Sequence, residues 1–327
     1  MQPFSYARAA NVPDAVRAGA EPGTIFLAGG TELLNWLRLG IAAPRRVLDI
    51  SRVEGLDRIE PLEGGGLRLG ALVRLNDAAR HEDVARDYPV LSQAILKAAS
   101  AQLRNLATLG GNPVQKTRCA YFRAEETLPC NKRVPGSGCA ALHGLNDRHA
   151  IFGWTEDCVA TQPSDPAVAL AALDAVIVTD QRRIPARAFH TLPAEGARPE
   201  DDNVLHQGEL ITAIELPAPA APRSAYVKVR ERESYEYAIV SAAAVVELDN
   251  AAIRHARLAL GSVAHRPWRL DEAERRLIGV EIGSPEARAA IEAAFADARP
   301  LSHNAYKIPL ARNTALRALE LAARMPA

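Results

Sequence analysis

A predicted strand runs through two adjacent glycines into a predicted helix at Leu27-Ala28-Gly29-Gly30-Thr31-Glu32-Leu33-Leu34, and the rest of the chain is interpreted from this turn. Neighbouring glycines lack the Cβ atoms that would keep a phosphate away from the backbone. The helix behind them, with Thr31 as its expected N-cap, would add free N–H donors. The turn is therefore a candidate phosphate-binding loop; a tight strand-to-helix turn without a ligand is the alternative. It lacks the GxGxxG pattern, so no Rossmann unit is predicted.

Two further segments carry similar chemistry. The second glycine-rich loop is Ala107-Thr108-Leu109-Gly110-Gly111-Asn112. Its paired glycines and polar side chains could bind phosphate or ribitol oxygens, so two loops could hold one pyrophosphate from both sides. The third segment is Ser164-Asp165-Pro166, where Asp165 precedes a predicted helix. Asp165 could accept hydrogen bonds from a ligand, and a helix cap is the alternative.

The hydrophobic periodicity divides the chain into three parts. We expect an α/β subdomain at residues 1–57, a second subdomain at 58–220 and an α+β domain at 221–327. In the first two parts, strands are predicted at 24–28, 46–50, 64–75 (after a glycine turn) and 175–180, and helices at 14–20, 32–37, 76–85, 89–101 and 168–174. In the last part, strands are predicted at 225–229, 238–248 and 253–261, and helices at 285–297 and 313–325.

The four cysteines of the chain lie in one weakly periodic insertion, at about residues 114–162. They are Cys119, Cys130, Cys139 and Cys158, with the spacing C-x10-C-x8-C-x18-C. A long irregular segment in a compact domain needs something to hold it. Disulfides, a zinc ion, unpaired buried thiols and a [4Fe–4S] cluster are the possible explanations. Zinc sites usually pair their ligands as C-x2-4-C, whereas a cluster takes four thiolates that need not be closely paired.

The composition gives no indication of a nucleic acid or membrane partner. The chain has 327 residues, and 39 lysines and arginines balance 39 aspartates and glutamates. A basic surplus is typical of proteins that bind nucleic acid or anionic membranes. No uninterrupted apolar run is long enough to span a bilayer, and the first residues lack the apolar core of a secretory signal.

The two loops and the Ser-Asp turn, in this order, resemble the FAD-binding subunit or domain of the xanthine dehydrogenase (molybdenum hydroxylase) family. The resemblance implies an α+β fold: a two-part FAD-binding domain of the VAO/PCMH type, like that of the CO dehydrogenase flavoprotein, and then a small domain with a three-stranded sheet and helices. It implies that residues 27–34 wrap the FAD pyrophosphate and that residues 107–112 and Asp165 also contact FAD. It further implies FAD contacts for Leu210 and Lys228, for which a core leucine and a surface lysine are the alternatives.

The cysteine segment resembles the cluster loop in the FAD subunit of bacterial periplasmic aldehyde oxidoreductases. The matching stretches are RCAYF, PCNKRVPGSGCAALHG and the cysteine before PSD. The resemblance implies that Cys119, Cys130, Cys139 and Cys158 bind a [4Fe–4S] cluster. Hydroxybenzoyl-CoA reductases carry a related insertion and are an alternative. His143 and His149 could be metal ligands, but a surface or structural role is expected. The segment Tyr235 to Tyr237 could stack near a flavin edge, but a packed strand is expected.

The expected function is electron transfer and not direct attack on a substrate. The partners would be a molybdopterin subunit that oxidises an aldehyde to its acid, a small [2Fe–2S] subunit and an external electron acceptor. The alternatives are a zinc-stapled nucleotide-binding module and a self-sufficient flavin oxidase. The subunit is expected either to stay in the cytoplasm or to reach the periplasm with a signal-bearing partner.

Overall fold

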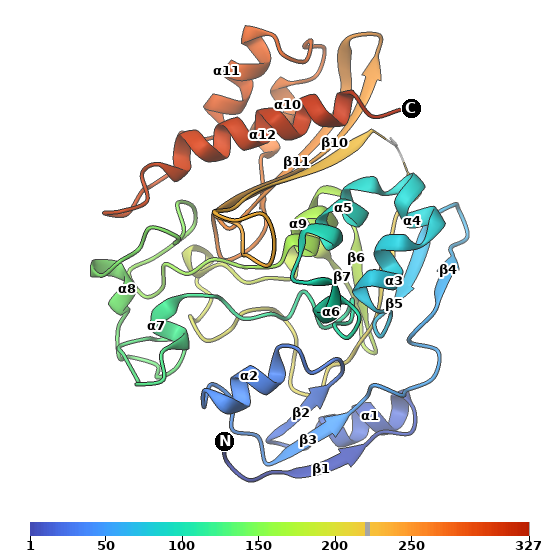
Figure 1. The fold of residues 1–327 in the computed structure, drawn as a ribbon, viewed down its shortest axis with the longest axis vertical. Helices are drawn as coiled ribbons and strands as arrows, with labels where there is room; N and C mark the ends of the chain where they lie inside the picture. The colour runs from blue at the N-terminus through green and yellow to red at the C-terminus, as the bar shows by residue number, and fades with distance from the viewer. Residues whose placement is uncertain (220–222, 327) are drawn as a thin grey trace.

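The computed structural model describes residues 1–219 and 223–326. Three sheets follow one another along the longest axis of the molecule (Figure 1). The N-terminal sheet lies at one end, a five-stranded sheet in the middle, and the C-terminal sheet with its helices at the other end. The C-terminal sheet packs onto the middle unit through a shared core.

The N-terminal unit is a three-stranded parallel sheet in the order β1-β3-β2. Its elements are β1 (Ser5–Arg8), α1 (Val12–Gly19), β2 (Thr24–Leu27), α2 (Leu33–Arg38) and β3 (Arg46–Asp49). Parallel neighbours need a long crossover connection, and the two helices supply it. One core packs around Leu48 and Ala15, and a second around Trp36 and Leu37. Strand β2 ends at Leu27, which is the first residue of the first glycine loop.

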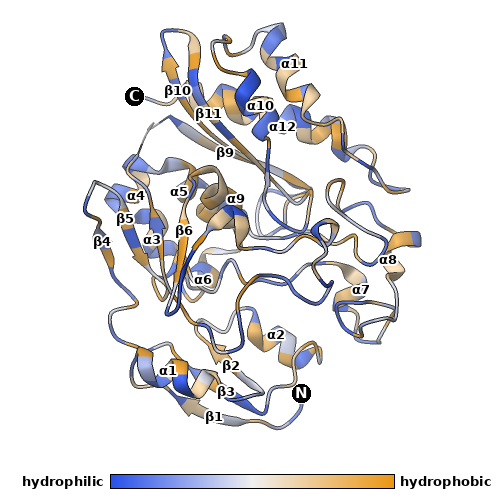
Figure 2. Cartoon of the chain, turned by 180° about the vertical axis from the view of Figure 1, so that it is seen from behind, coloured by the Kyte–Doolittle hydropathy of each residue, from blue (hydrophilic) through white to orange (hydrophobic). Residues whose placement is uncertain are grey.

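The middle unit is an antiparallel sheet in the order β4-β5-β8-β6-β7. Its strands are β4 (Ile59–Pro61), β5 (Leu67–Gly70), β6 (Val176–Thr179), β7 (Arg183–Pro185) and β8 (Ile211–Leu216). Its helices are α3 (Leu75–Arg80), α4 (Glu82–Asp87), α5 (Pro89–Lys97), α6 (Ala101–Arg104) and α9 (Asp165–Ala172), with short 3-10 turns at Ala186–Ala188 and Pro193–Glu195. All eight residues of α9 are buried because it packs against α5, β10 and β11. Figure 2 shows β6 and α9 as largely hydrophobic segments inside the molecule.

The C-terminal unit is an antiparallel sheet in the order β12-β11-β10-β9, with helices packed on it. Its strands are β9 (Ser224–Val229), β10 (Val240–Asp249), β11 (Ala252–Gly261) and β12 (Trp268–Arg269). Its helices are α10 (Asp271–Arg276), α11 (Pro285–Ala293) and α12 (Lys307–Ala323). A turn at Asn250, with φ +56°, joins the two long central strands.

The predicted α+β fold is confirmed, with several local corrections. The three expected C-terminal strands are present, but the two-residue β12 makes the sheet four-stranded. The helix expected at 76–85 is two helices, because His81 between them is extended. Strand β8 was not predicted, since all six of its residues are buried and its sequence does not alternate. The boundary expected at residue 220 lies outside the described residues.

The cysteine segment contains only two short helices, α7 (Ala120–Arg123) and α8 (Ala140–His143). It protrudes on one side of the molecule, where both helices are seen in Figure 1. Two side chains of the C-terminal unit, those of Lys307 and Asn304, donate hydrogen bonds to the backbone of this segment. Lys307 Nζ donates hydrogen bonds to the carbonyl oxygens of His149 (2.8 Å), Arg148 (3.2 Å) and Ser262 (2.5 Å). Asn304 Nδ2 donates to the carbonyl oxygens of His149 and Ala150, both at 3.1 Å.

We expect Lys307→Met to destabilise the protein by roughly 2–4 kcal/mol, because it leaves three carbonyl groups in a closed environment without their donor. Lys307 is fully buried, so water cannot replace the ammonium without rearrangement. Urea denaturation measures the change. Arg317→Met is the matched control on the same helix, where Arg317 pairs only with Glu320 at the surface; its effect should stay within about 0.5 kcal/mol. Equal denaturation midpoints for the two variants would contradict this anchoring role.

Candidate functional site

The first glycine loop connects β2 to α2. Gly30 has φ +72°, a left-handed conformation that side chains disfavour. Helix α2 begins at Leu33, so Thr31 is not its N-cap as expected; Glu32 occupies that position without a capping hydrogen bond from its side chain. The expected helix dipole contributes little here, because α2 has only six residues. A ligand in the cavity would therefore meet the glycine backbone and small side chains of this loop, and the helix terminus would contribute little.

The second glycine loop packs directly against the first. A Cβ atom built on Gly29 would lie 2.1 Å from the carbonyl oxygen of Leu106. On the other side, a Cβ atom on Gly110 would lie 2.6 Å from the Cβ atom of Ala71. Two glycines therefore let the two loops approach each other and the underlying chain more closely than alanines would permit.

A cavity of about 480 Å³ lies where the loops meet, a volume typical of cofactor pockets (~300–1,000 Å³). Fourteen of the seventeen residues predicted to contact a ligand line it: Ala28, Gly29, Gly30, Thr31, Glu32, Leu33, Ala107, Thr108, Gly110, Gly111, Asn112, Asp165, Leu210 and Lys228. The other three do not. Leu109 is fully buried in the core, Leu34 is 55% exposed, and Leu27 packs against the core of the N-terminal unit.

Asp165 and Lys228 form a buried ion pair at the cavity wall. Lys228 Nζ lies 2.8 Å from Asp165 Oδ2, and the hydroxyl of Tyr226 donates to Asp165 Oδ1 at 2.6 Å. Complete burial raises the pKa of Asp165, while the ammonium and the hydroxyl oppose this by favouring the carboxylate. The surface-lysine alternative for Lys228 is wrong, because its side chain is 1% exposed. The pair joins the middle unit to β9 and directs charged groups at the cavity.

Further cavity residues come from distant parts of the chain, and Trp36 and Arg118 among them were not predicted. Arg118 stacks over the ring of Tyr237 at 4.5 Å, and Trp36 Nε1 donates to Glu32 Oε1 at 2.7 Å. The segment Tyr235 to Tyr237 is a loop between β9 and β10 that lines the cavity. The expected packed strand is therefore wrong at this place. No local pattern marks these residues, since only the folded chain brings them together.

Glu32 connects the first glycine loop to the cysteine segment. Its carboxylate accepts hydrogen bonds from Arg118 and Arg123, both at 2.6 Å. Burial raises the pKa of Glu32, but the guanidinium groups of Arg118 and Arg123 lower it by more. The pKa of this carboxyl group is therefore below its usual value. The carboxylate therefore remains charged and holds the two segments together.

The four cysteines surround a second, small cavity and are all unpaired. Burial raises the pKa of the thiols of Cys119 (to about 11), Cys130 and Cys158 (to about 12), and neighbouring backbone N–H groups oppose this only in part. His149 Nε2 lies 3.2 Å from Cys119 Sγ. Four cysteine thiols around one cavity are the ligand set that a [4Fe–4S] cluster takes.

In residues 1–219 and 223–326, no three His, Cys, Asp or Glu side chains lie close enough to share one ion. Zinc needs its sulfur ligands at about 2.3 Å. An iron–sulfur cluster holds its four thiolates further apart, since each binds a different iron atom.

Comparisons with known proteins agree with this geometry. The family described as "FAD binding domain in molybdopterin dehydrogenase" matches residues 2–219, and the family described as "CO dehydrogenase flavoprotein C-terminal domain" matches residues 225–322. The aldehyde oxidoreductase FAD-binding subunit PaoB of Escherichia coli K12 is 46% identical over 321 residues, which are 96% of each chain. The glyceraldehyde dehydrogenase medium chain of Sulfolobus acidocaldarius is 28% identical and covers 85% of this chain and 82% of its own.

Solved structures share the whole fold. A chain of carbon monoxide dehydrogenase from Hydrogenophaga pseudoflava superposes with a TM-score of 0.75 and 26% identity, over 99% of both chains. No helix within the described residues is both long and apolar enough to cross a membrane. One family matches more than half of the chain, and a relative with 46% identity matches almost all of it. The chain therefore belongs to the FAD-binding subunits of the xanthine dehydrogenase (molybdenum hydroxylase) family.

Proposed function

We propose that this chain is the FAD- and [4Fe–4S]-containing electron-transfer subunit of a molybdenum aldehyde oxidoreductase. Electrons would reach it from a [2Fe–2S] partner and leave to an external acceptor, while a molybdopterin subunit oxidises the aldehyde. The relative with 46% identity, an aldehyde oxidoreductase subunit, supports this substrate class over the hydroxybenzoyl-CoA alternative.

One observation carries the proposal: alternating residues of one short stretch of chain line the large and the small cavity. Gln115 and Arg118 line the large cavity, whereas Thr117 and Cys119 line the small one. These residues are neighbours in one irregular stretch, so a cluster held by the cysteines would lie close to a flavin in the large cavity. A separate structural zinc module would not need this arrangement.

The residues of the large cavity fit FAD. The two glycine loops leave room for a pyrophosphate against the backbone, and the apolar walls include Trp36, Leu75 and Leu103. FAD supplies the exchange of one or two electrons, and the protein positions it and adjusts its electrostatics. Asp165, Lys228 and Arg118 bring the charged groups to this cavity.

We expect Gly29→Ala to weaken FAD binding at least tenfold, since the new Cβ atom would force apart the two loops at the carbonyl of Leu106; tenfold corresponds to about 1.4 kcal/mol. The flavin content of the purified chain and the affinity of the stripped chain for FAD measure the effect. Gly279→Ala is the control. Gly279 has φ +79°, and a Cβ atom there would meet no atom within 4 Å, so this variant adds a side chain away from the cavity. Full flavin content in Gly29→Ala would contradict the assignment of this loop.

We expect the purified chain to contain about four iron and four sulfide atoms, because a [4Fe–4S] cluster takes four cysteine ligands. Cys139→Ser and Cys158→Ser should each lose most of this iron, as measured by metal and sulfide analysis with an absorption spectrum. His143→Ala, an exposed neighbour in the same segment, should retain it. Zinc in place of iron, without sulfide, would support the zinc-stapled alternative and refute the cluster.

A further inference from the structure

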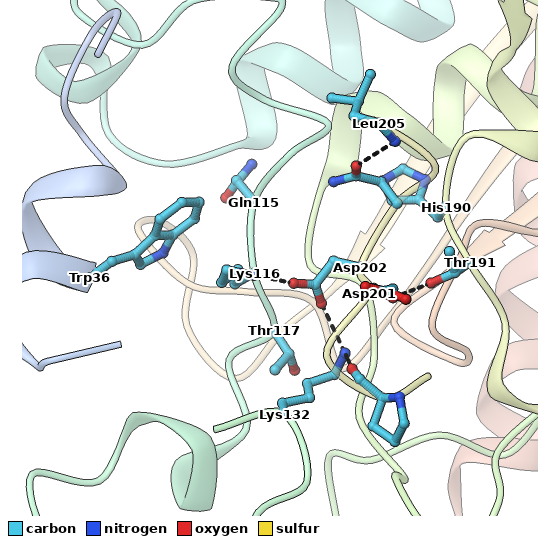
Figure 3. Close-up of polar contacts among 12 residues, drawn as sticks. Trp36, Gln115, Lys116, Thr117, Lys132, His190, Thr191, Asp201, Asp202 and Leu205 are labelled. Carbon is cyan, nitrogen blue, oxygen red and sulfur yellow. Dashed lines mark hydrogen bonds and ion pairs between the residues drawn. The ribbon is translucent and has the colours of Figure 1, made fainter. Parts of the chain in front are cut away.

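A row of three charged side chains, Lys132, Asp202 and Lys116, begins at the cysteine cavity and ends over Trp36. Figure 3 shows Asp202 between Lys116 and Lys132. Lys132 Nζ lies 2.9 Å from Asp202 Oδ1, and Lys116 binds the other carboxylate oxygen. Lys116 also lies over the ring of Trp36, 5.4 Å from its centroid, and Trp36 lines the large cavity. Two cations therefore share one anion, which leaves a net positive charge inside the protein.

The two lysines differ in their surroundings. The side chain of Lys132 is 4% exposed, whereas that of Lys116 is 27% exposed. Lys132 Nζ also donates to the carbonyl oxygen of Pro199 at 2.5 Å, which fixes it in place. A charge that is shielded from water acts more strongly on its neighbours than a partly solvated one.

Lys132 adjoins the cysteine cavity and Lys116 does not. Lys132 lines that cavity together with Cys130 and Cys158. Its ammonium group interacts electrostatically with both Cys130 and Cys158. Lys132 therefore lies beside the proposed cluster ligands at this cavity.

We propose that the ammonium group of Lys132, held by Asp202, raises the reduction potential of the cluster. The inference rests on the [4Fe–4S] cluster proposed above. One-electron reduction adds a negative charge to the cluster and its thiolates, and a fixed cation beside them favours that state. Local charge is one of the means by which proteins adjust such potentials.

The test is a redox titration of the full-length chain, isolated with its partner subunits, with dithionite as the electron donor. The EPR signal of the reduced cluster reports its midpoint potential. Lys132→Met removes the charge at similar length, and Lys132→Gln removes the charge but can still hydrogen-bond to Asp202. Lys116→Met is the matched control, because it removes the other cation of Asp202 away from the cysteines. Iron and sulfide content is measured for every variant.

Both Lys132 variants should shift the ratio of reduced to oxidised cluster at least tenfold toward the oxidised form, which is about 59 mV for one electron. Lys116→Met should shift it clearly less. An unchanged potential in Lys132→Gln, or equal shifts for Lys116 and Lys132 variants, would overturn the inference. Loss of iron from both Lys132 variants would also overturn it, since Lys132 would then serve assembly. A wild-type chain without iron and sulfide would instead refute the cluster itself.

Discussion

The structure depends on the contact between Gly29 and the backbone of Leu106. This contact joins the N-terminal parallel sheet to the middle unit, and the large cavity lies beside it. A side chain at Gly29 cannot be accommodated by a rotamer change, because the opposing atom is a main-chain carbonyl. The position of both loops, and hence the shape of the cavity, follows from this one approach.

Local signals in the sequence were sufficient to predict the two loops. The three ordered segments placed twelve residues on one cavity, and the family resemblance added Leu210 and Lys228. The rest of the lining was not predictable in this way. Arg118 and Tyr237 are separated by more than a hundred residues, and their stacking depends on how β9 and β10 pack. Strand β8 was missed for a related reason: burial on both faces removes the alternation by which strands are recognised.

Side-chain contacts, and not helices or strands, hold most of the cysteine segment in place. Its carbonyl groups accept from Lys307 and Asn304, its arginines bind Glu32, and Lys132 binds Asp202. These partners belong to all three units of the protein. Contacts with all three units therefore hold the segment in place, and the sequence revealed only its cysteines.

The anchoring of residues 148–150 by Lys307 also has a consequence for biosynthesis. Proteins emerge from the ribosome N-terminus first, and domains begin to fold in that order. Lys307 belongs to the last helix of the chain, and the walls of the large cavity extend from Phe26 to Tyr237. The large cavity therefore lacks part of its wall until Tyr237 has been translated, and the backbone at residues 148–150 lacks its anchor until Lys307 has been translated.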